Sequence, residues 1–369
     1  MDEQSQKKAD VNVVEYKCPC CGAALSFAPG SQQMRCAACL NTFDLEAVKD
    51  YNDALVTPKE NVQWDDYGDE DSQGWKDGEA EEMQVFTCPS CGGEILTDTN
   101  TAATFCPYCE NPAVIPGRVS RQFRPDFVVP FQNDKNSAKE ALKRLCKGKI
   151  LLPKGFVGEN RLEMISGMYV PFWLYSCDVD AQAVYKATQV SGWSDSEYNY
   201  TKTDYYMLWR AGQMSFDGVP VDGSKKMEDG YMESVEPYDY SKAVDFDTAY
   251  LSGYLADKYD VTAQEGQPRA NARIEATADS MLAGTAQGYA TVLRQSGGNQ
   301  LSNTKIRYGL LPVWMLNTKY KDKIYTFAMN GQTGKIVGQL PVDKGKCWAL
   351  FGGITAWLSL LFLLISLLF

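Results

Sequence analysis

Two sets of four cysteines with identical spacing constrain the fold of this chain more than any other feature. Each set consists of two C-x2-C pairs separated by fourteen residues, and the second set follows the first at an offset of 70 residues. The flanks repeat too, since Pro19 corresponds to Pro89 and Gly22 to Gly92. A constant offset over motif and flanks indicates an internal repeat. The sets are Cys18, Cys21, Cys36 and Cys39, and Cys88, Cys91, Cys106 and Cys109.

This spacing is typical of zinc ribbons. A C-x2-C knuckle brings two thiolates to one point, and two knuckles complete the tetrahedral shell that Zn2+ prefers. Thioredoxin-like redox pairs are the alternative, but they require a βαβ context that the sequence lacks. We therefore predict two zinc ions per chain, one in a ribbon at 16–46 and one in a ribbon at 86–117. Both ions are expected to be structural, because a closed four-thiolate shell leaves no open position for a substrate.

The other cysteines and the absence of histidine limit the chemistry further. The start of the chain lacks the apolar core of a signal peptide, so the twelve cysteines point to a reducing compartment and to metal ligation rather than disulfides. Without histidine, catalytic triads of the usual kind are excluded. Cys20 is expected to be an exposed non-ligand, and Cys146, Cys177 and Cys347 to be small apolar residues.

The charge of the chain is unevenly distributed. Overall, 47 acidic residues exceed 36 basic ones, which disfavours non-specific nucleic-acid binding. Residues 1–15 are predicted to be disordered, and residues 47–85 to form a solvated acidic linker, because nine acidic residues and one lysine fall between Asp65 and Glu82. The aromatic residues of that linker are either docking residues for a partner or incidentally exposed; they are Trp64, Tyr67 and Trp75.

A basic segment follows the second ribbon. From Arg118 to Lys154 there are ten basic and three acidic residues, a net charge of +7. An amphipathic helix is predicted inside it, with Asn136 or Ser137 as N-cap. Its basic face is an ordinary solvated surface, or it contacts anionic lipid, the acidic linker or nucleic acid. The apolar face consists of Ala138, Ala141, Leu142 and Leu145, and the basic face of Lys139, Lys143 and Lys147.

The rest of residues 118–343 has the pattern of a mixed α+β body with antiparallel strands. Alternating and continuous apolar runs predict the strands, and an Asn-Gly dipeptide predicts a hairpin turn at Asn330. Strands are expected over Met168–Val190, Asp204–Phe216 and, as a meander that also turns near Lys321, over Lys305–Leu340; helical spacing appears over Tyr250–Leu255 and Ile274–Leu282.

The C-terminal segment Cys347–Phe369 contains 23 residues without a charge. At about 1.5 Å per residue, such a helix spans a hydrocarbon core of about 30 Å. Lys344 and Lys346 precede it, so the positive-inside rule places the preceding body in the cytoplasm. We predict a single-pass tail anchor in the cell membrane, with residues 347–369 as the transmembrane helix.

Several segments together resemble a Firmicute family of TFIIB-type zinc-ribbon membrane proteins, the YdjG-like proteins. They are the two cysteine quartets, Val129–Phe131, Leu151–Pro153, Tyr169–Trp173 and Leu310–Trp314. The resemblance implies a bacterial membrane setting, with SPFH-like or PspA-like membrane-stress proteins as partners, and it supplies no catalytic residues. Some relatives carry a replication-restart helicase label. This chain lacks the required G-x4-G-K-[ST] loop, because Lys335 is followed by Ile336.

Three functions are compatible with the sequence. We favour a membrane-anchored adaptor or scaffold that binds protein partners and is not an enzyme, since binding accounts for every module. The first alternative is a nucleic-acid-, transcription- or replication-associated protein, which the near absence of basic residues in both ribbons disfavours. The second is an enzyme that uses body carboxylates such as Asp178 and Asp180. The sequence assigns no catalytic or organic-cofactor residue and no oligomeric state.

Overall fold

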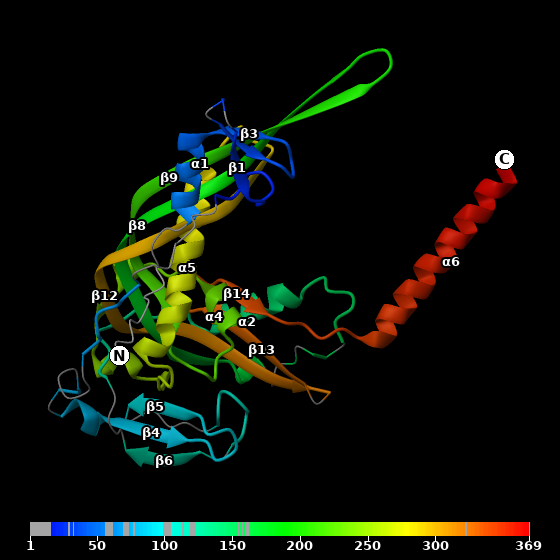
Figure 1. Ribbon diagram of the computed structural model, residues 1–369. Coiled ribbons are helices and arrows are strands. Elements are labelled where there is room, and N and C mark those ends of the chain that lie inside the picture. The colour runs from blue at the N-terminus through cyan, green and yellow to red at the C-terminus, as the bar shows by residue number, and fades with distance from the viewer. Residues whose placement is uncertain are drawn as a thin grey trace, which may run out of the picture. The chain divides into compact units, whose positions relative to one another are not determined.

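The computed structural model describes residues 16–28, 30–31, 33–55, 62–68, 74–76, 78–98, 105–112, 114–118, 123–153, 155–156, 158, 162–321 and 323–368. The N-terminal segment 1–15, predicted to be disordered, lies outside the described residues. The chain is α+β with antiparallel strands, as predicted (Figure 1). It divides into two units, and neither unit is one of the predicted domains. Unit 1 comprises residues 1–64, 176–216 and 271–304, and unit 2 comprises 65–175, 217–270 and 305–369.

The first ribbon, in unit 1, has a small sheet of its own. Its three strands pair antiparallel in the order β1-β2-β3, and a helix, α1, follows directly. The helix completes the ribbon, because Val48 is fully buried and Asn52 Oδ1 accepts a hydrogen bond from Lys17 N at 2.8 Å. The ribbon therefore extends beyond the predicted end at residue 46. The bounds are β1 Leu25–Ala28, β2 Gln33–Cys36, β3 Thr42–Asp44 and α1 Leu45–Leu55.

Three long strands of the 11-stranded sheet contribute to unit 1, where β8 pairs with β9 on one side and with β12 on the other. They are β8 (Ser166–Ser194), β9 (Asn199–Asp222) and β12 (Thr291–Tyr320), and each extends into unit 2. Helix α5 (Ala263–Gly284) confirms the helix predicted over Ile274–Leu282. Its C-terminal half is bound to this sheet, since Asp279 O accepts from Tyr185 OH at 3.3 Å.

Unit 2 contains a mixed sheet with the strand order β10-β7-β12-β8-β11-β5-β4-β6 and a meander of β12, β13 and β14. Helices α2 and α4 and short 3-10 helices η1, η2 and η3 accompany it. The bounds are η1 Glu79–Glu82, β4 Met83–Thr87, β5 Glu94–Asp98, β6 Ile115–Arg118, β7 Phe127–Val128, α2 Lys135–Cys146, α4 Asp229–Val235, η2 Tyr240–Lys242, β10 Val244–Asp245, η3 Thr248–Leu251, β11 Leu255–Asp257, β13 Lys323–Asn330 and β14 Ile336–Gly338.

The core of unit 2 is built on the Pro-Phe-Trp strand. Met168, Val170 and Phe172 alternate along β8 and are buried together with Leu311 and Val313 of β12. On β12, Trp314 faces the opposite side and packs with helix α2. The buried faces of these two strands explain why the sequence shows continuous apolar runs rather than a single alternation.

Three local sequence predictions need correction. The spacing of Tyr250–Leu255 is not helical: η3 ends at Leu251, and Leu255 begins β11, which pairs with both β8 and β5. Tertiary pairing has overridden the local pattern there. The N-cap of α2 is Asp134 rather than Asn136 or Ser137, because Asp134 Oδ1 accepts from Ser137 N at 2.8 Å. Strand β9 begins at Asn199, five residues before the predicted start.

The described part of segment 47–85 is not a solvated linker. In unit 1, Trp64 is 5% exposed and its Nε1 donates to Asn271 Oδ1 at 2.7 Å. In unit 2, Tyr67 is 5% exposed, with its ring centroid 4.9 Å from that of Trp173. The third aromatic residue, Trp75, packs edge-on against Phe246. These three side chains pack against other parts of their own chain. The acidic composition of the segment did not predict this packing.

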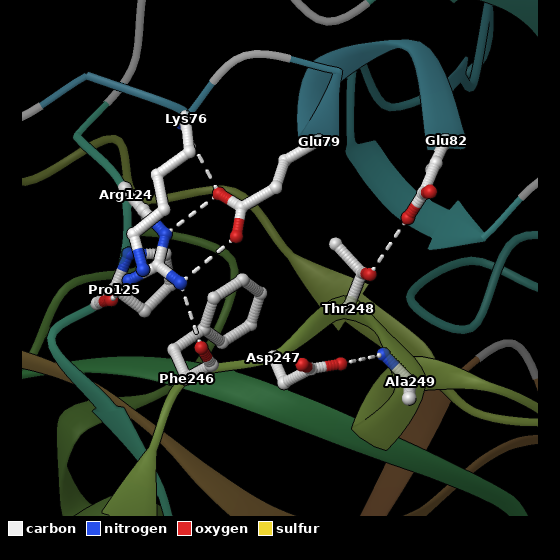
Figure 2. A network of polar contacts seen from close by, with 9 residues as sticks. All are labelled: Lys76, Glu79, Glu82, Arg124, Pro125, Phe246, Asp247, Thr248 and Ala249. Atoms are coloured by element: carbon white, nitrogen blue, oxygen red, sulfur yellow. Dashed lines mark hydrogen bonds and ion pairs between the residues drawn. The ribbon is translucent and has the colours of Figure 1, made fainter.

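Acidic and basic segments also meet in unit 2. Figure 2 shows Arg124 as the centre of a polar network, in which its Nε lies 2.7 Å from Glu79 Oε2 and its Nη2 donates to Phe246 O at 2.7 Å. Nearby, Thr248 Oγ1 donates to Glu82 Oε2 at 3.0 Å. The ion pair between Arg124 and Glu79 joins the predicted acidic linker to the basic segment, and it does so outside the basic helix.

Candidate metal centres

In the first ribbon, two tight turns aim four thiols at one another. Cys18 O accepts from Gly22 N at 2.9 Å, and Cys36 O accepts from Leu40 N at 3.0 Å. Both turns need a positive φ, which is 75° at Gly22 and 62° at Leu40. Glycine adopts such a conformation at low cost, whereas leucine does so rarely.

The second ribbon repeats this geometry residue for residue. Cys88 O accepts from Gly92 N at 2.8 Å, and Cys106 O accepts from Glu110 N at 2.9 Å. The φ angles are 68° at Gly92 and 61° at Glu110, close to those of the equivalent positions 70 residues earlier. The repeat seen in the sequence is therefore also a structural repeat of both knuckles.

All four sulfur atoms of each quartet lie within 4.8 Å of one another. The Sγ pairs Cys18–Cys39 and Cys21–Cys36 are 3.6 and 3.5 Å apart. In the second ribbon, Cys88–Cys109 and Cys91–Cys106 are each 3.6 Å apart. A tetrahedral ion with metal–sulfur bonds of about 2.3 Å separates its ligands by about 3.8 Å, so the thiols fit such an ion. The geometry confirms two potential four-thiolate metal sites and does not itself identify the metal.

The environment of two thiols favours the thiolate that a metal requires. Backbone N–H groups of Cys39 and Ala38 lower the pKa of Cys36 to about 6. Burial raises the pKa of Cys88, but hydrogen bonds from the N–H groups of Cys91 and Ser90 and from the thiols of Cys109 and Cys106 together lower it to about 7. Cys20 lies outside the quartet, as predicted, and its carbonyl oxygen accepts a hydrogen bond from Lys186 Nζ.

The two ribbons differ in how they are embedded. Strand β5 of the second ribbon pairs with β11, so this ribbon belongs to the sheet of unit 2. Asn317 Nδ2 donates to Pro107 O at 2.7 Å, and Lys226 Nζ donates to Cys91 O at 2.7 Å. Cys88 and Cys106 are part of the buried core of the unit. The sequence did not predict this embedding, because it depends on strand pairing between segments more than 150 residues apart.

A buried carboxyl group next to the second ribbon was missed altogether. Asp257 is 4% exposed and lies beside the buried Tyr108, which stands in the sequence between Cys106 and Cys109 of the second quartet. Burial is the main cause that raises the pKa of Asp257, to about 7, while hydrogen bonds from Ser224 and Tyr108 act in the opposite direction. Only recognition of β11 as a strand could have pointed to Asp257 from the sequence. The helical spacing of Tyr250–Leu255 predicted a helix there instead.

The carboxylates considered for an enzyme, Asp178 and Asp180, line one hollow of unit 1, where neighbouring side chains hold Asp178. Asp178 Oδ1 accepts from Ser215 Oγ at 2.6 Å, and Oδ2 accepts from Asn303 Nδ2 at 2.7 Å. These bonds hold the pKa of Asp178 below its ordinary value. Asp180 is exposed. Gly331–Gly334 forms the turn between β13 and β14 and is not followed by a helix, unlike a phosphate-binding loop.

Helix α6 (Lys344–Leu368) is the one described helix that is long and apolar enough to cross a membrane, over Lys344–Ile365 (red in Figure 1). None of this stretch is buried against the rest of the chain. Large apolar side chains such as Trp348 and Phe362 are 72% and 75% exposed. The helix is compatible with a single-pass membrane anchor, in agreement with the sequence prediction.

Comparison with known proteins places the chain in a family. The uncharacterized protein YdjG of Bacillus subtilis (strain 168) is 35% identical to it over 355 residues, which are 96% of this chain and 98% of YdjG. The chain belongs to the YdjG family. The match to YdjG covers nearly the full length of both chains. No protein-family model and no solved structure matches the chain.

Proposed function

We propose that this protein is a membrane-anchored adaptor whose first zinc ribbon binds a protein partner. In this proposal α6 spans the cell membrane, the two units lie in the cytoplasm, and each quartet holds a structural Zn2+. The closed thiol shells leave no open coordination position for substrate chemistry.

One comparison between the ribbons carries the proposal. Phe27 and Leu40 of the first ribbon are 51% and 66% exposed. The equivalent positions of the second ribbon, 70 residues later, are the fully buried Thr97 and the polar Glu110. The first ribbon thus presents two large apolar side chains at positions where the second ribbon has a buried or a polar residue, although Ile115 of the second ribbon is itself 59% exposed. Exposed apolar groups of this kind favour a protein partner.

Charge supports a protein partner over nucleic acid. Residues 16–45 contain Lys17 and Arg35 against Asp44, and residues 86–117 contain no basic residue. Phosphate contacts require clustered lysine and arginine, which neither ribbon provides. SPFH-like or PspA-like membrane-stress proteins are the candidates that the family resemblance suggests.

The test uses the full chain, tagged and cross-linked in membranes, with quantitative mass spectrometry of the proteins recovered after detergent extraction. The double variant Phe27→Thr/Leu40→Asn removes the apolar pair and keeps a residue that tolerates positive φ at position 40. We expect the zinc content to stay at two ions while a specific partner is lost. Ile324→Thr, which changes a 52% exposed residue of unit 2, is the matched control. Unchanged recovery, or recovered nucleic acid that disappears on zinc removal, would contradict the adaptor function.

A further inference from the structure

A basic pocket with an apolar floor lies where helix α2 ends. Its volume is about 470 Å3. Its basic side chains are the exposed Lys143, Arg144 and Lys147, in the last turn and C-cap of the helix. The loop that follows contributes Pro153 and Phe156, both buried. Such a pocket offers positive charge and an apolar surface to the same ligand.

This pocket is fixed to the start of the membrane helix. Leu151 O accepts from Asp343 N at 2.8 Å, and Leu152 O accepts from Lys346 Nζ at 2.5 Å. Since α6 begins at Lys344, the pocket loop is bonded directly to the point where the chain enters the membrane. Ile150, beside the loop, is 69% exposed, as expected for an aliphatic side chain at the level of lipid headgroups.

The charges on α2 are divided between its two ends. At the N-terminal end, Lys135 Nζ donates to Glu163 O at 2.7 Å, and Lys139 Nζ lies 2.6 Å from Glu163 Oε1. At the pocket end, Lys147 makes no ion pair within the described residues, and Arg144 reaches Glu140 only at 3.8 Å, with both side chains exposed. At the pocket end of α2, Arg144 and Lys147 are therefore the charges available to a ligand.

We propose that this pocket binds the phosphate headgroup of an anionic phospholipid. The guanidinium of Arg144 and the ammonium group of Lys147 contact the phosphate oxygens, and the glycerol and first acyl methylenes lie against Leu152, Pro153 and Phe156. Free phosphate shares the anionic chemistry but gains nothing from the apolar floor, so a lipid is the better fit. The inference rests on the proposed role of α6 as a membrane span.

The test titrates the full chain, held in an uncharged detergent, with phosphatidylglycerol, phosphatidylcholine or inorganic phosphate, and counts bound lipid by native mass spectrometry. Each basic residue near an anionic group strengthens attraction about fivefold, so Arg144→Gln/Lys147→Gln should weaken phosphatidylglycerol binding about 25-fold. The control Lys135→Gln/Lys139→Gln removes the same charge from the same helix and should change binding less than threefold.

Three outcomes would overturn the lipid site: equal binding of the two phospholipids, equal weakening by both double variants, or displacement of the lipid by millimolar phosphate. Thermal unfolding of each variant without lipid shows whether it is folded. Membrane fractionation of the wild type is read separately. If the wild-type chain is not membrane-integrated, the anchor fails, whereas a retained anchor with unselective lipid binding refutes the pocket alone.

A second, independent observation concerns the open edge of strand β9 in unit 1. Figure 1 shows β8 and β9 side by side, and within the described residues β9 pairs with β8 alone. The stretch Asn199–Phe216 has no proline and no positive φ. In contrast, β12 at the other edge of this sheet is interrupted by Gly297, with φ 144°, and Asn303, with φ 50°. Irregular backbone protects an edge from pairing, and β9 lacks that protection.

The side chains of β9 are complementary to themselves. If two copies pair antiparallel about a two-fold axis at Met207, Asp204 of each faces Arg210 of the other. In the same register, Tyr205 faces Trp209, and these residues are 49% and 54% exposed in the single chain. A shift of the axis to Tyr206 would instead place Lys202 opposite Arg210. Charge and aromatic pairing thus favour the Met207 register over the Tyr206 register. In the single chain Asp204 lies 3.0 Å from Lys202 Nζ and Arg210 Nε donates to Thr285 Oγ1 at 2.9 Å, so the dimer exchanges these contacts for the cross-strand pair.

We infer that the chain forms a homodimer through antiparallel pairing of β9 centred on Met207. In this register Met207 faces itself, at a Cα separation of about 4.5–5.5 Å, which a disulfide can bridge. Met207→Cys should therefore cross-link two full chains under mild oxidation. The control Ala211→Cys faces Thr203 and should not cross-link above the background of the native cysteines.

The oligomeric state of the full chain in detergent, from light scattering coupled to size exclusion, gives the second readout. The wild type should be dimeric at micromolar concentration. Met207→Lys places two like charges on the axis and should give monomers that keep two zinc ions. A monomeric wild type, a dimer that survives Met207→Lys, or equal cross-linking at positions 207 and 211 would refute this interface.

Discussion

The side-chain amide of Asn317, on β12, donates a hydrogen bond of 2.7 Å to the carbonyl oxygen of Pro107, inside the second cysteine knuckle. The amide oxygen of Asn317 in turn accepts from Thr326 Oγ1 at 2.6 Å. Asn317 is 8% exposed, and its bond to Pro107 is buried. Through this one side chain, strands β12 and β13 are tied to a candidate metal-binding turn.

Asn317→Ala is expected to lower stability without loss of metal. Removal of the amide leaves the buried carbonyl of Pro107 and the half-buried hydroxyl of Thr326 without their partner, and the loss at the buried carbonyl alone costs about 1–3 kcal/mol. Thermal unfolding of the full chain in detergent should show a fall in Tm of several degrees, with two zinc ions still bound. The exposed Gln300→Ala should have no comparable effect. Equal Tm values for both variants would show that the hydrogen bond contributes little.

Replacement of one ligand in each ribbon should have unequal consequences. Cys18→Ser and Cys88→Ser are each expected to reduce the zinc content from two ions to one, because a closed site needs all four thiolates. Cys88 lies in the core of unit 2, so its loss should also lower the Tm of the body, whereas Cys18→Ser should affect mainly the first ribbon. Elemental analysis and calorimetry measure the two effects. Two retained zinc ions in either variant would contradict the ligand assignment.

The buried carboxyl group of Asp257 should contribute measurably to the pH dependence of stability. Its pKa in the folded chain, raised by burial to about 7, exceeds the ordinary value of 3.8. Between these values the folded state binds one more proton than the unfolded state, so the contribution of this group to stability falls as pH rises from 3.8 to about 7 and is level above. Asp257→Asn should therefore raise the Tm at pH 8 and have little effect near pH 4.

A matched variant separates this effect from the general titration of the protein. Asp245→Asn removes one carboxylate from an exposed position of β10. The difference in Tm between Asp245→Asn and the wild type should be the same at pH 4 and at pH 8, whereas that of Asp257→Asn should be larger at pH 8. A parallel response of both variants would refute the role of the buried carboxyl group.

Deletion of 347–369 tests the anchor directly. The remaining chain lacks the apolar segment needed to cross about 30 Å of hydrocarbon. We expect the truncated protein in the soluble fraction after cell lysis and the full chain in the membrane fraction, resistant to carbonate extraction. The soluble form should retain two zinc ions, which shows that it is folded. Continued membrane association of the truncated chain at high salt would show that another segment integrates into the bilayer.

Local sequence signals predicted those parts of the structure that local geometry determines. The cysteine spacing identified both metal centres, because a C-x2-C turn aims its thiols regardless of the surrounding fold. Helix α5 and the long strand β8 were found from periodicity alone, although β8 extends four residues beyond the predicted end at Val190. The apolar helix at the C-terminus required only its length and the lack of charge.

Long-range contacts determine what the sequence did not reveal. Tyr67 lies in an acidic stretch whose composition predicts a linker. In the structure its hydroxyl donates to Asp126 Oδ2 at 2.9 Å and its ring packs on Trp173. Leu255 and Asp257 belong to a short strand that exists because β5 and β8 flank it. In both cases the decisive partner lies far away in the chain, where neither propensity nor periodicity carries information.

The unequal embedding of two ribbons with the same knuckle geometry has a consequence for how this chain changes over generations. A duplicated module that has become part of a shared core is constrained from every side, and Gly93 illustrates this, since an added Cβ would lie 2.7 Å from the ring of Tyr108. Its counterpart Ala23 already carries a side chain. The first ribbon should therefore tolerate substitutions that change its surface, whereas substitutions in the second ribbon would disturb the core of unit 2. Sequence divergence among relatives should concentrate on the strands and loop between Gly22 and Arg35.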